Sequence, residues 1–180
     1  MKTNFISEIK NNLNEINAKK LDKAVYLINK MSKKNKIILA GNGASAAISS
    51  HLAIDFTKAA GVRAVNFNES SLVTCFSNDF GYENWIKRAL QYYLLPGDII
   101  ILISSSGKSK NIVNAAKFLR NKKNKLITLT GLNIKNPLKK LGNLNFFVNS
   151  KNYNVTESTH LIILLNIVEK LIKQKKKIND

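Results

Sequence analysis

The chain has 180 residues, of which 44% are hydrophobic, and a formal net charge of +18. This length suits one well-buried domain and is short for two, and the hydrophobic fraction excludes a largely disordered chain. A lone cysteine excludes an internal disulfide, the start lacks the apolar run of a secretion signal, and no apolar run reaches the roughly 20 residues of a membrane span, so a cytoplasmic protein with no membrane partner is expected.

Near residue 36 the pattern changes from helices alone to strands that alternate with helices. Within residues 1–33, apolar residues recur at helical spacing and predict two helices. Short apolar runs, separated by helical stretches, then predict strands over 37–40, 64–65, 99–103, 126–129 and 146–148, and a final helix over about 156–173. Strands that are apolar on both faces, with helices between them, indicate an α/β fold with a doubly wound five-stranded parallel sheet, flanked by helices and preceded by N-terminal helices.

We interpret residues 1–180 as one domain, in which leading helices (1–33) precede an α/β core (36–150) and a C-terminal helix (156–175). The positive charge would suit a nucleic acid, because clustered Lys and Arg bind polyanions. Here, however, lysines are spread along the chain, and only Lys173-Gln174-Lys175-Lys176-Lys177 is dense, which is typical of a solvated helix end. The signatures of nucleic-acid-binding motifs, which are the helix-turn-helix, the ligand spacing of zinc fingers and stacking aromatic residues, are missing, so no nucleic-acid partner is expected.

Two strands end in loops suited to an anion. The first predicted strand runs into Gly41-Asn42-Gly43-Ala44-Ser45-Ala46, and the third into Ser104-Ser105-Ser106-Gly107-Lys108-Ser109. Small hydroxyls and the N–H groups of a helix N-terminus bind phosphate well, and the carboxyl ends of parallel strands share one edge of the sheet. The two loops together predict a small phosphorylated ligand. The alternative for the second loop is an ordinary serine-rich turn with a serine N-cap.

The first loop also fits a dinucleotide fingerprint with alanine in its last position, a weak pattern by itself. The acidic residue expected at the end of the next strand is missing, since the first carboxylate there is Glu69. Lys108 does not complete a P-loop, because the glycine spacing of that motif differs. No nucleotide cofactor is therefore expected.

Five motifs in order resemble the sugar isomerase (SIS) domain of phosphoheptose isomerases. They are Gly41-Asn42-Gly43-Ala44-Ser45, His51-Leu52-Ala53-Ile54-Asp55, Asn78-Asp79-Phe80-Gly81, Pro96-Gly97-Asp98 and Ile103-Ser104-Ser105-Ser106-Gly107-Lys108-Ser109. The resemblance extends over almost the whole chain. It implies an aldose–ketose isomerase that acts on sedoheptulose 7-phosphate, and a homotetramer with active sites at subunit interfaces.

The resemblance also implies roles for individual residues. The phosphate-binding positions of the family correspond to Ser104, Ser105, Ser106 and Ser109, the substrate contacts of the first loop to Asn42, Gly43 and Ser45, and a residue that holds sugar hydroxyls to Asp79. The family's zinc site and acid/base pair fall on four positions, which are His51, Asp55, Glu157 and Leu165 in this chain. The family has His and Glu at the first two of these positions, Gln or Glu at the third, and His at the fourth. The binding residues match in chemistry, whereas the catalytic ones are altered.

The altered positions leave two interpretations open. Asp55 is the candidate base, although its side chain is about 1 Å shorter than that of glutamate, a misplacement that can cost roughly a hundredfold in rate. Leu165 can neither bind a metal nor transfer a proton. His160 is the nearest replacement for the lost acid, but it lies about 140° around the helix from Leu165. A non-catalytic sugar-phosphate binder or sensor is therefore the alternative to an isomerase.

A zinc site is a further hypothesis. His51 and Asp55 share a helix face at i and i+4, and Glu157 would complete three ligands with a fourth position open to water. Alternatively, His51 packs beside the first loop, Asp55 pairs with a lysine, Glu157 lies in the first turn of its helix and His160 is a buried structural residue.

Overall fold

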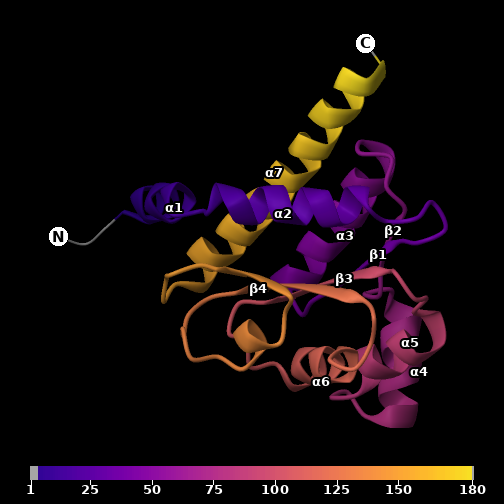
Figure 1. Ribbon diagram of the computed structural model, residues 1–180. Coiled ribbons are helices and arrows are strands. Elements are labelled where there is room, and N and C mark those ends of the chain that lie inside the picture. The colour runs from indigo at the N-terminus through magenta and orange to yellow at the C-terminus, as the bar shows by residue number, and fades with distance from the viewer. Residues whose placement is uncertain (1–3, 180) are drawn as a thin grey trace.

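The computed structural model describes residues 4–179, in which a parallel sheet lies between two layers of helices (Figure 1). The elements are α1 (Phe5–Asn14), α2 (Ala18–Asn29), β1 (Ile37–Ala40), α3 (Ala44–Lys58), β2 (Ala64–Asn66), α4 (Ser70–Phe80), α5 (Trp85–Tyr93), β3 (Ile99–Ser104), α6 (Lys110–Leu119), β4 (Lys125–Thr130), the 3-10 helix η1 (Leu138–Lys140), β5 (Leu144–Phe147) and α7 (Tyr153–Asn179). The outermost residues of the predicted domain, 1–3 and 180, and the side chains of the lysine cluster at 176 and 177 lie outside the described part.

The sheet confirms the predicted fold class. Its five strands are all parallel, in the order β2-β1-β3-β4-β5. The chain passes from β1 outward to β2 and then returns across β1 to β3, so the winding direction reverses between β1 and β3. In doubly wound sheets a ligand binds in the crevice at this point, outside the carboxyl ends of the two strands.

Alternate residues of the central strands pack into two separate cores. Ile37, Leu39 and Ile101 point to the layer of α2, α3 and α7, whereas Ile38 and Ile100 point to α5 and α6. Figure 1 shows these helices on opposite sides of the sheet. Successive side chains of a strand alternate between faces, so a strand covered on both faces must be apolar throughout. This requirement produces the uninterrupted apolar runs of the sequence.

Two element bounds differ from the sequence prediction. β5 covers 144–147 rather than 146–148, and it alternates between buried and half-buried residues because it is an edge strand. α7 begins at Tyr153 rather than Thr156, because the side chain of Asn152 accepts a hydrogen bond from the Asn154 N–H at 2.9 Å and so caps the helix earlier. Glu157 therefore lies beyond the first turn, and the prediction that placed it there is wrong.

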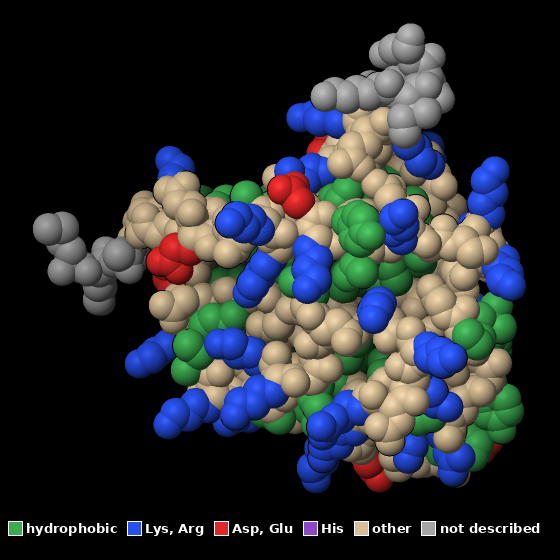
Figure 2. Space-filling model, viewed as in Figure 1, with side chains coloured by type: hydrophobic (Ala, Val, Ile, Leu, Met, Phe, Trp, Pro, Cys, Tyr) green, Lys and Arg blue, Asp and Glu red, His purple; other side chains and the backbone are tan. Residues whose placement is uncertain are grey.

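Positive side chains cover the surface widely. In Figure 2, Lys and Arg are distributed over the whole of the face shown rather than gathered into one stripe. Among the described residues, none of the helices has the length and apolar character needed to cross a bilayer.

Candidate functional site

A cavity of about 280 Å³ lies at the carboxyl ends of β1 and β3, where the winding direction reverses. Its lining consists of Asn42, Gly43, Ala44, Ser45, Ile103, Ser104, Ser105, Ser106, Ser109, Tyr153 and Glu157. The structure thus brings both predicted loops to one cavity and adds the first turns of α7. All four serines assigned to phosphate and all three first-loop residues are among the lining.

The serine loop leaves its hydroxyls clustered at the start of α6. The N–H of Gly107 donates to Ser104 O at 2.9 Å and closes the turn. The hydroxyls of Ser104 and Ser109 lie 3.2 Å apart, and Ser106 Oγ accepts a hydrogen bond from the Lys108 N–H at 3.2 Å. Ser109 is the N-cap of α6, but its hydroxyl makes no capping hydrogen bond. One N–H of this helix end, that of Ile112, has a side-chain acceptor, Asn111 Oδ1 at 2.9 Å. The hydroxyls and the other N–H groups of this helix end together suit a phosphate group.

The first loop presents a second helix end to the same cavity. Gly43 is the N-cap of α3 and has φ +55° and ψ −125°, a conformation that glycine adopts most readily, and again no side chain caps the helix. The loop is held by Asn68, whose amide both accepts from Gly41 N–H at 3.2 Å and donates to Gly41 O at 2.8 Å. Two helix N-termini therefore converge on one cavity, and each favours negative charge.

Glu157 is the one carboxylate among the residues that line the cavity. It is half-buried, and its Oε1 accepts a hydrogen bond from Ser105 Oγ at 3.4 Å. Glu157 and Ser105 are 52 residues apart in the chain, and the passage of α7 beside the end of β3 brings them together. A carboxylate next to a phosphate-type loop can act as a general base or bind sugar hydroxyls.

His51 and Asp55 form a pair on α3 outside this cavity. His51 Nε2 lies 3.1 Å from Asp55 Oδ2, and their side chains are 53% and 30% exposed. Asp55 is ten residues beyond Ser45, which places it about 15 Å further along the helix. Among residues 4–179 no three His, Cys, Asp or Glu side chains form a group that could hold a metal ion. His51, Asp55 and Glu157 of one chain therefore do not fit a zinc site.

Two other predicted residues also lie outside the cavity lining. His160 is fully buried in α7, with Nε2 3.2 Å from Thr130 O and no partner for Nδ1. Burial lowers the pKa of His160 to about 4, against the opposing effect of the hydrogen bond to Thr130, so the ring is neutral at pH 7. Asp79 is exposed on α4, where its carboxylate accepts from Asn78 Nδ2 at 3.0 Å.

Three residues near the cavity escaped the sequence analysis. Tyr153 lines the cavity, while Tyr82 and Asn111 contact the side chain of Asn42 from two other segments. Tyr82 follows the Asn78–Gly81 motif by one residue, and Asn111 follows the serine loop by two, so both positions could have been considered. Nothing local marks either side chain as a neighbour of Asn42.

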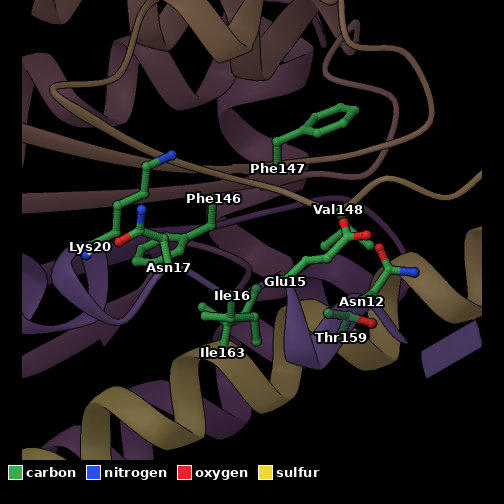
Figure 3. Close-up of a pocket in the computed structure, with 10 residues that line it drawn as sticks. All are labelled: Asn12, Glu15, Ile16, Asn17, Lys20, Phe146, Phe147, Val148, Thr159 and Ile163. Atoms are coloured by element: carbon green, nitrogen blue, oxygen red, sulfur yellow. Dashed lines mark hydrogen bonds between the residues drawn. The ribbon is translucent and has the colours of Figure 1, made fainter. Parts of the chain in front are cut away.

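A second hollow, at the β5 edge of the sheet, is too small for a sugar phosphate. It has a volume of about 60 Å³, room for a few water molecules. Figure 3 shows its lining from α1, α2 and the connection between them, from β5 and the residue after it, and from α7: Asn12, Glu15, Ile16, Asn17, Lys20, Phe146, Phe147, Val148, Thr159 and Ile163. The cavity between the two loops is therefore the better candidate for a metabolite site.

Known proteins share both the sequence pattern and the fold. Residues 3–131 match the SIS domain family. A phosphoheptose isomerase of Buchnera aphidicola subsp. Schizaphis graminum is 34% identical over 173 residues, which cover 92% of this chain and 89% of that protein. A phosphoheptose isomerase structure from Francisella tularensis superposes with a TM-score of 0.84 at 21% identity, covering 94% of this chain and 92% of that one. The Vibrio vulnificus NanR protein, complexed with ManNAc-6P, gives a TM-score of 0.76 at 19% identity, covering 97% of this chain and 62% of that one.

Proposed function

This chain belongs to the SIS domain family, and we propose that it binds a phosphorylated sugar and isomerises it between ketose and aldose, as phosphoheptose isomerases do. The observation that supports the proposal is the convergence of the serine loop, the first loop and Glu157 on one cavity. Sedoheptulose 7-phosphate is the proposed substrate, because the curated relatives are named for a phosphorylated heptose.

The phosphate is proposed to bind the serine loop. Ser104, Ser106 and Ser109 supply hydroxyl donors, and the N-terminus of α6 supplies a favourable dipole. The sugar would then extend toward Asn42 and Glu157, which line the rest of the cavity. Neutral donors bind a phosphate while leaving room for a sugar, and the net charge of +18 draws anions toward the protein.

The reaction itself moves one carbon-bound proton. A base removes a proton from C1 of the ketose while the C2 oxygen is protonated, which gives an enediol; a proton is then returned to C2 as the C1 hydroxyl loses its own, and an aldose results. Such a step requires a positioned carboxylate. We propose Asp55 as the base, and its distance of about 15 Å from Ser45 along α3 means that it would serve the cavity of a second copy.

The surface around Asp55 supports such an assembly. Ile54 and Val65, on α3 and the edge strand β2, are 62% and 39% exposed and border an open groove. Adjoining exposed apolar side chains beside one groove fit a surface that another chain covers. The homotetramer that the family resemblance implies, with sites shared between subunits, is part of the proposal.

A non-catalytic sugar-phosphate binder is the second candidate. Leu165 stands where the resemblance places a histidine, and it packs against the apolar core beneath α7. The Vibrio protein of similar fold is described in complex with ManNAc-6P, a sugar phosphate. Loss of an acid would abolish proton transfer without disturbing the phosphate-binding loop.

Proton exchange separates the two candidates. The protein is incubated with sedoheptulose 7-phosphate in heavy water, and deuterium at C1 of the recovered ketose and formation of the aldose are measured beside calorimetric binding. The isomerase proposal expects label and aldose; binding without either would favour the second candidate, and no binding would overturn both.

Variants then assign the base. Asp55→Asn should keep the affinity and lose about 100-fold or more in exchange. Glu169→Gln, on an exposed part of α7, is the matched control and should change neither. If Glu157→Gln loses deuterium exchange and Asp55→Asn keeps it, the base is Glu157, the carboxylate inside the cavity.

A further inference from the structure

The side chain of Asn42 is held by two residues from distant segments. Asn42 Nδ2 donates to Asn111 Oδ1 at 3.0 Å, and Asn111 Nδ2 donates back to Asn42 Oδ1 at 2.9 Å. Tyr82, in the turn between α4 and α5, places its hydroxyl 3.2 Å from Asn42 Oδ1. Asn111 is 2% exposed and does not line the cavity, whereas Asn42 does. The contacts therefore form a support behind a ligand-facing residue.

The hydrogen bonds determine which way each amide faces. The backbone N–H of Ile112 lies 2.9 Å from Asn111 Oδ1, and a backbone N–H can only donate, so this atom must be the oxygen. The other atom of the Asn111 amide is then the nitrogen, and it must donate to an oxygen of Asn42. Because Asn42 Oδ1 is only an acceptor, the Tyr82 hydroxyl must donate to it as well.

This arrangement leaves Asn42 a single free hydrogen-bonding function. A carbonyl oxygen has two lone pairs, and Asn111 and Tyr82 use both. The amide nitrogen has two hydrogens, of which one goes to Asn111. The planar amide directs the other hydrogen away from Asn111. Asn42 thus has one N–H to offer, and its carbonyl is already engaged.

We propose that Asn111 and Tyr82 are positioning residues that make Asn42 present an N–H donor, and not a carbonyl acceptor, to an oxygen atom of the bound sugar. The inference rests on the proposed function in taking the ligand of the cavity to be a sugar phosphate. Asn42 thereby selects a sugar oxygen that can accept a hydrogen bond, either the carbonyl oxygen of the sugar or one of its hydroxyl oxygens. A ligand whose group can only donate would leave the Asn42 N–H unpaired and covered from water, which is unfavourable.

The first test compares two ligands of the intact protein. Asn111→Ala frees the Asn42 amide, so the Kd of sedoheptulose 7-phosphate should rise about tenfold, the equivalent of one hydrogen bond, while the Kd of inorganic phosphate stays within about twofold. Asn114→Ala is the matched control, because Asn114 lies one turn further along α6 and donates at 3.0 Å only to Glu83 O. It should change neither affinity.

Tyr82→Phe keeps the test decisive if Asn111→Ala does not fold, since Tyr82 is 55% exposed and loses only its hydroxyl. It should weaken sugar-phosphate binding about threefold and leave phosphate binding unchanged. Unchanged sugar-phosphate affinity in both variants, or an equal loss for both ligands, would overturn the inference. Failure of the wild-type chain to bind the sugar phosphate would instead overturn the proposed function.

A second measurement needs no ligand. In the free wild-type protein, one side-chain amide hydrogen of Asn42 should exchange with solvent about tenfold more slowly than the other, and Asn111→Ala or Tyr82→Phe should reduce the difference. Equal and fast exchange of both hydrogens in the wild-type chain, measured by NMR, would refute the positioning role whether or not the sugar phosphate binds.

Discussion

Gly107 is the residue of the serine loop whose replacement we expect to be most damaging. Its φ is +62°, and a Cβ built on it would overlap the carboxamide of Asn136 and lie 2.8 Å from Asn136 Cβ. Asn136 cannot easily move, because it is fully buried, donates to Asn133 O at 2.7 Å and accepts from Lys139 N–H at 2.9 Å. Gly107→Ala must therefore distort either the segment around Asn136 or the phosphate-binding serine loop.

The cost has two parts that can be separated. The left-handed backbone costs about 1–2 kcal/mol for a residue with a Cβ, and overpacking against a buried side chain about 1–3 kcal/mol. Together they amount to roughly 2–5 kcal/mol, a large share of the 5–15 kcal/mol by which a typical domain is stable. Gly61→Ala is the matched control: its φ is +58°, but its Cβ would meet only the flexible end of Lys175, so only the backbone part applies.

Urea denaturation of a double-mutant cycle tests this reasoning. Asn136→Ala removes the overlapping carboxamide, so the double variant should be about 1–3 kcal/mol more stable than the sum of the two single changes predicts. Phosphate binding should fall in Gly107→Ala and recover in part in the double variant. Strict additivity of the two changes would refute the steric explanation, and a neutral Gly107→Ala would refute the whole argument.

Three further predictions concern the cavity and α7. Ser106→Glu places a carboxylate among the phosphate-binding hydroxyls and should abolish sugar-phosphate binding measured by calorimetry; retained affinity would contradict the assignment of that loop. The pKa of His160 lies near 4 in the folded chain and near 6.5 in the unfolded one, so the unfolded chain takes up a proton first as the pH falls. The free energy of unfolding should therefore drop by on the order of 3 kcal/mol from about pH 7 to pH 4, and this drop should be missing from His160→Gln, compared by urea titration at both pH values. Leu165→His should raise deuterium exchange into sedoheptulose 7-phosphate if a missing acid limits the reaction; unchanged exchange with unchanged binding would count against that cause.

The layered fold and one wall of the site are predictable from the order of residues along the chain. Apolar runs such as Ile99–Ile103 lack any polar face, so they had to be strands covered on both sides, and helices between them required parallel pairing. Parallel strands place their carboxyl ends at one edge, which brought the Gly41–Ala46 and Ser104–Ser109 loops together in prediction and in structure. These features depend on local composition and on topology, and both can be read along the chain.

Tertiary packing alone decided which distant side chains meet. His51 and Asp55 are correctly paired by their i, i+4 spacing, yet the direction of α3 carries both away from the cavity that begins at its N-terminus. Glu157 reaches Ser105 only because α7 packs across the sheet. This helix also begins about one turn earlier than the sequence predicted. The hydrogen bonds among Asn42, Tyr82 and Asn111 likewise join three distant segments, and nothing in the local sequence marks them. Such bonds depend on where packed helices end, and not on the residues next to each side chain in the sequence.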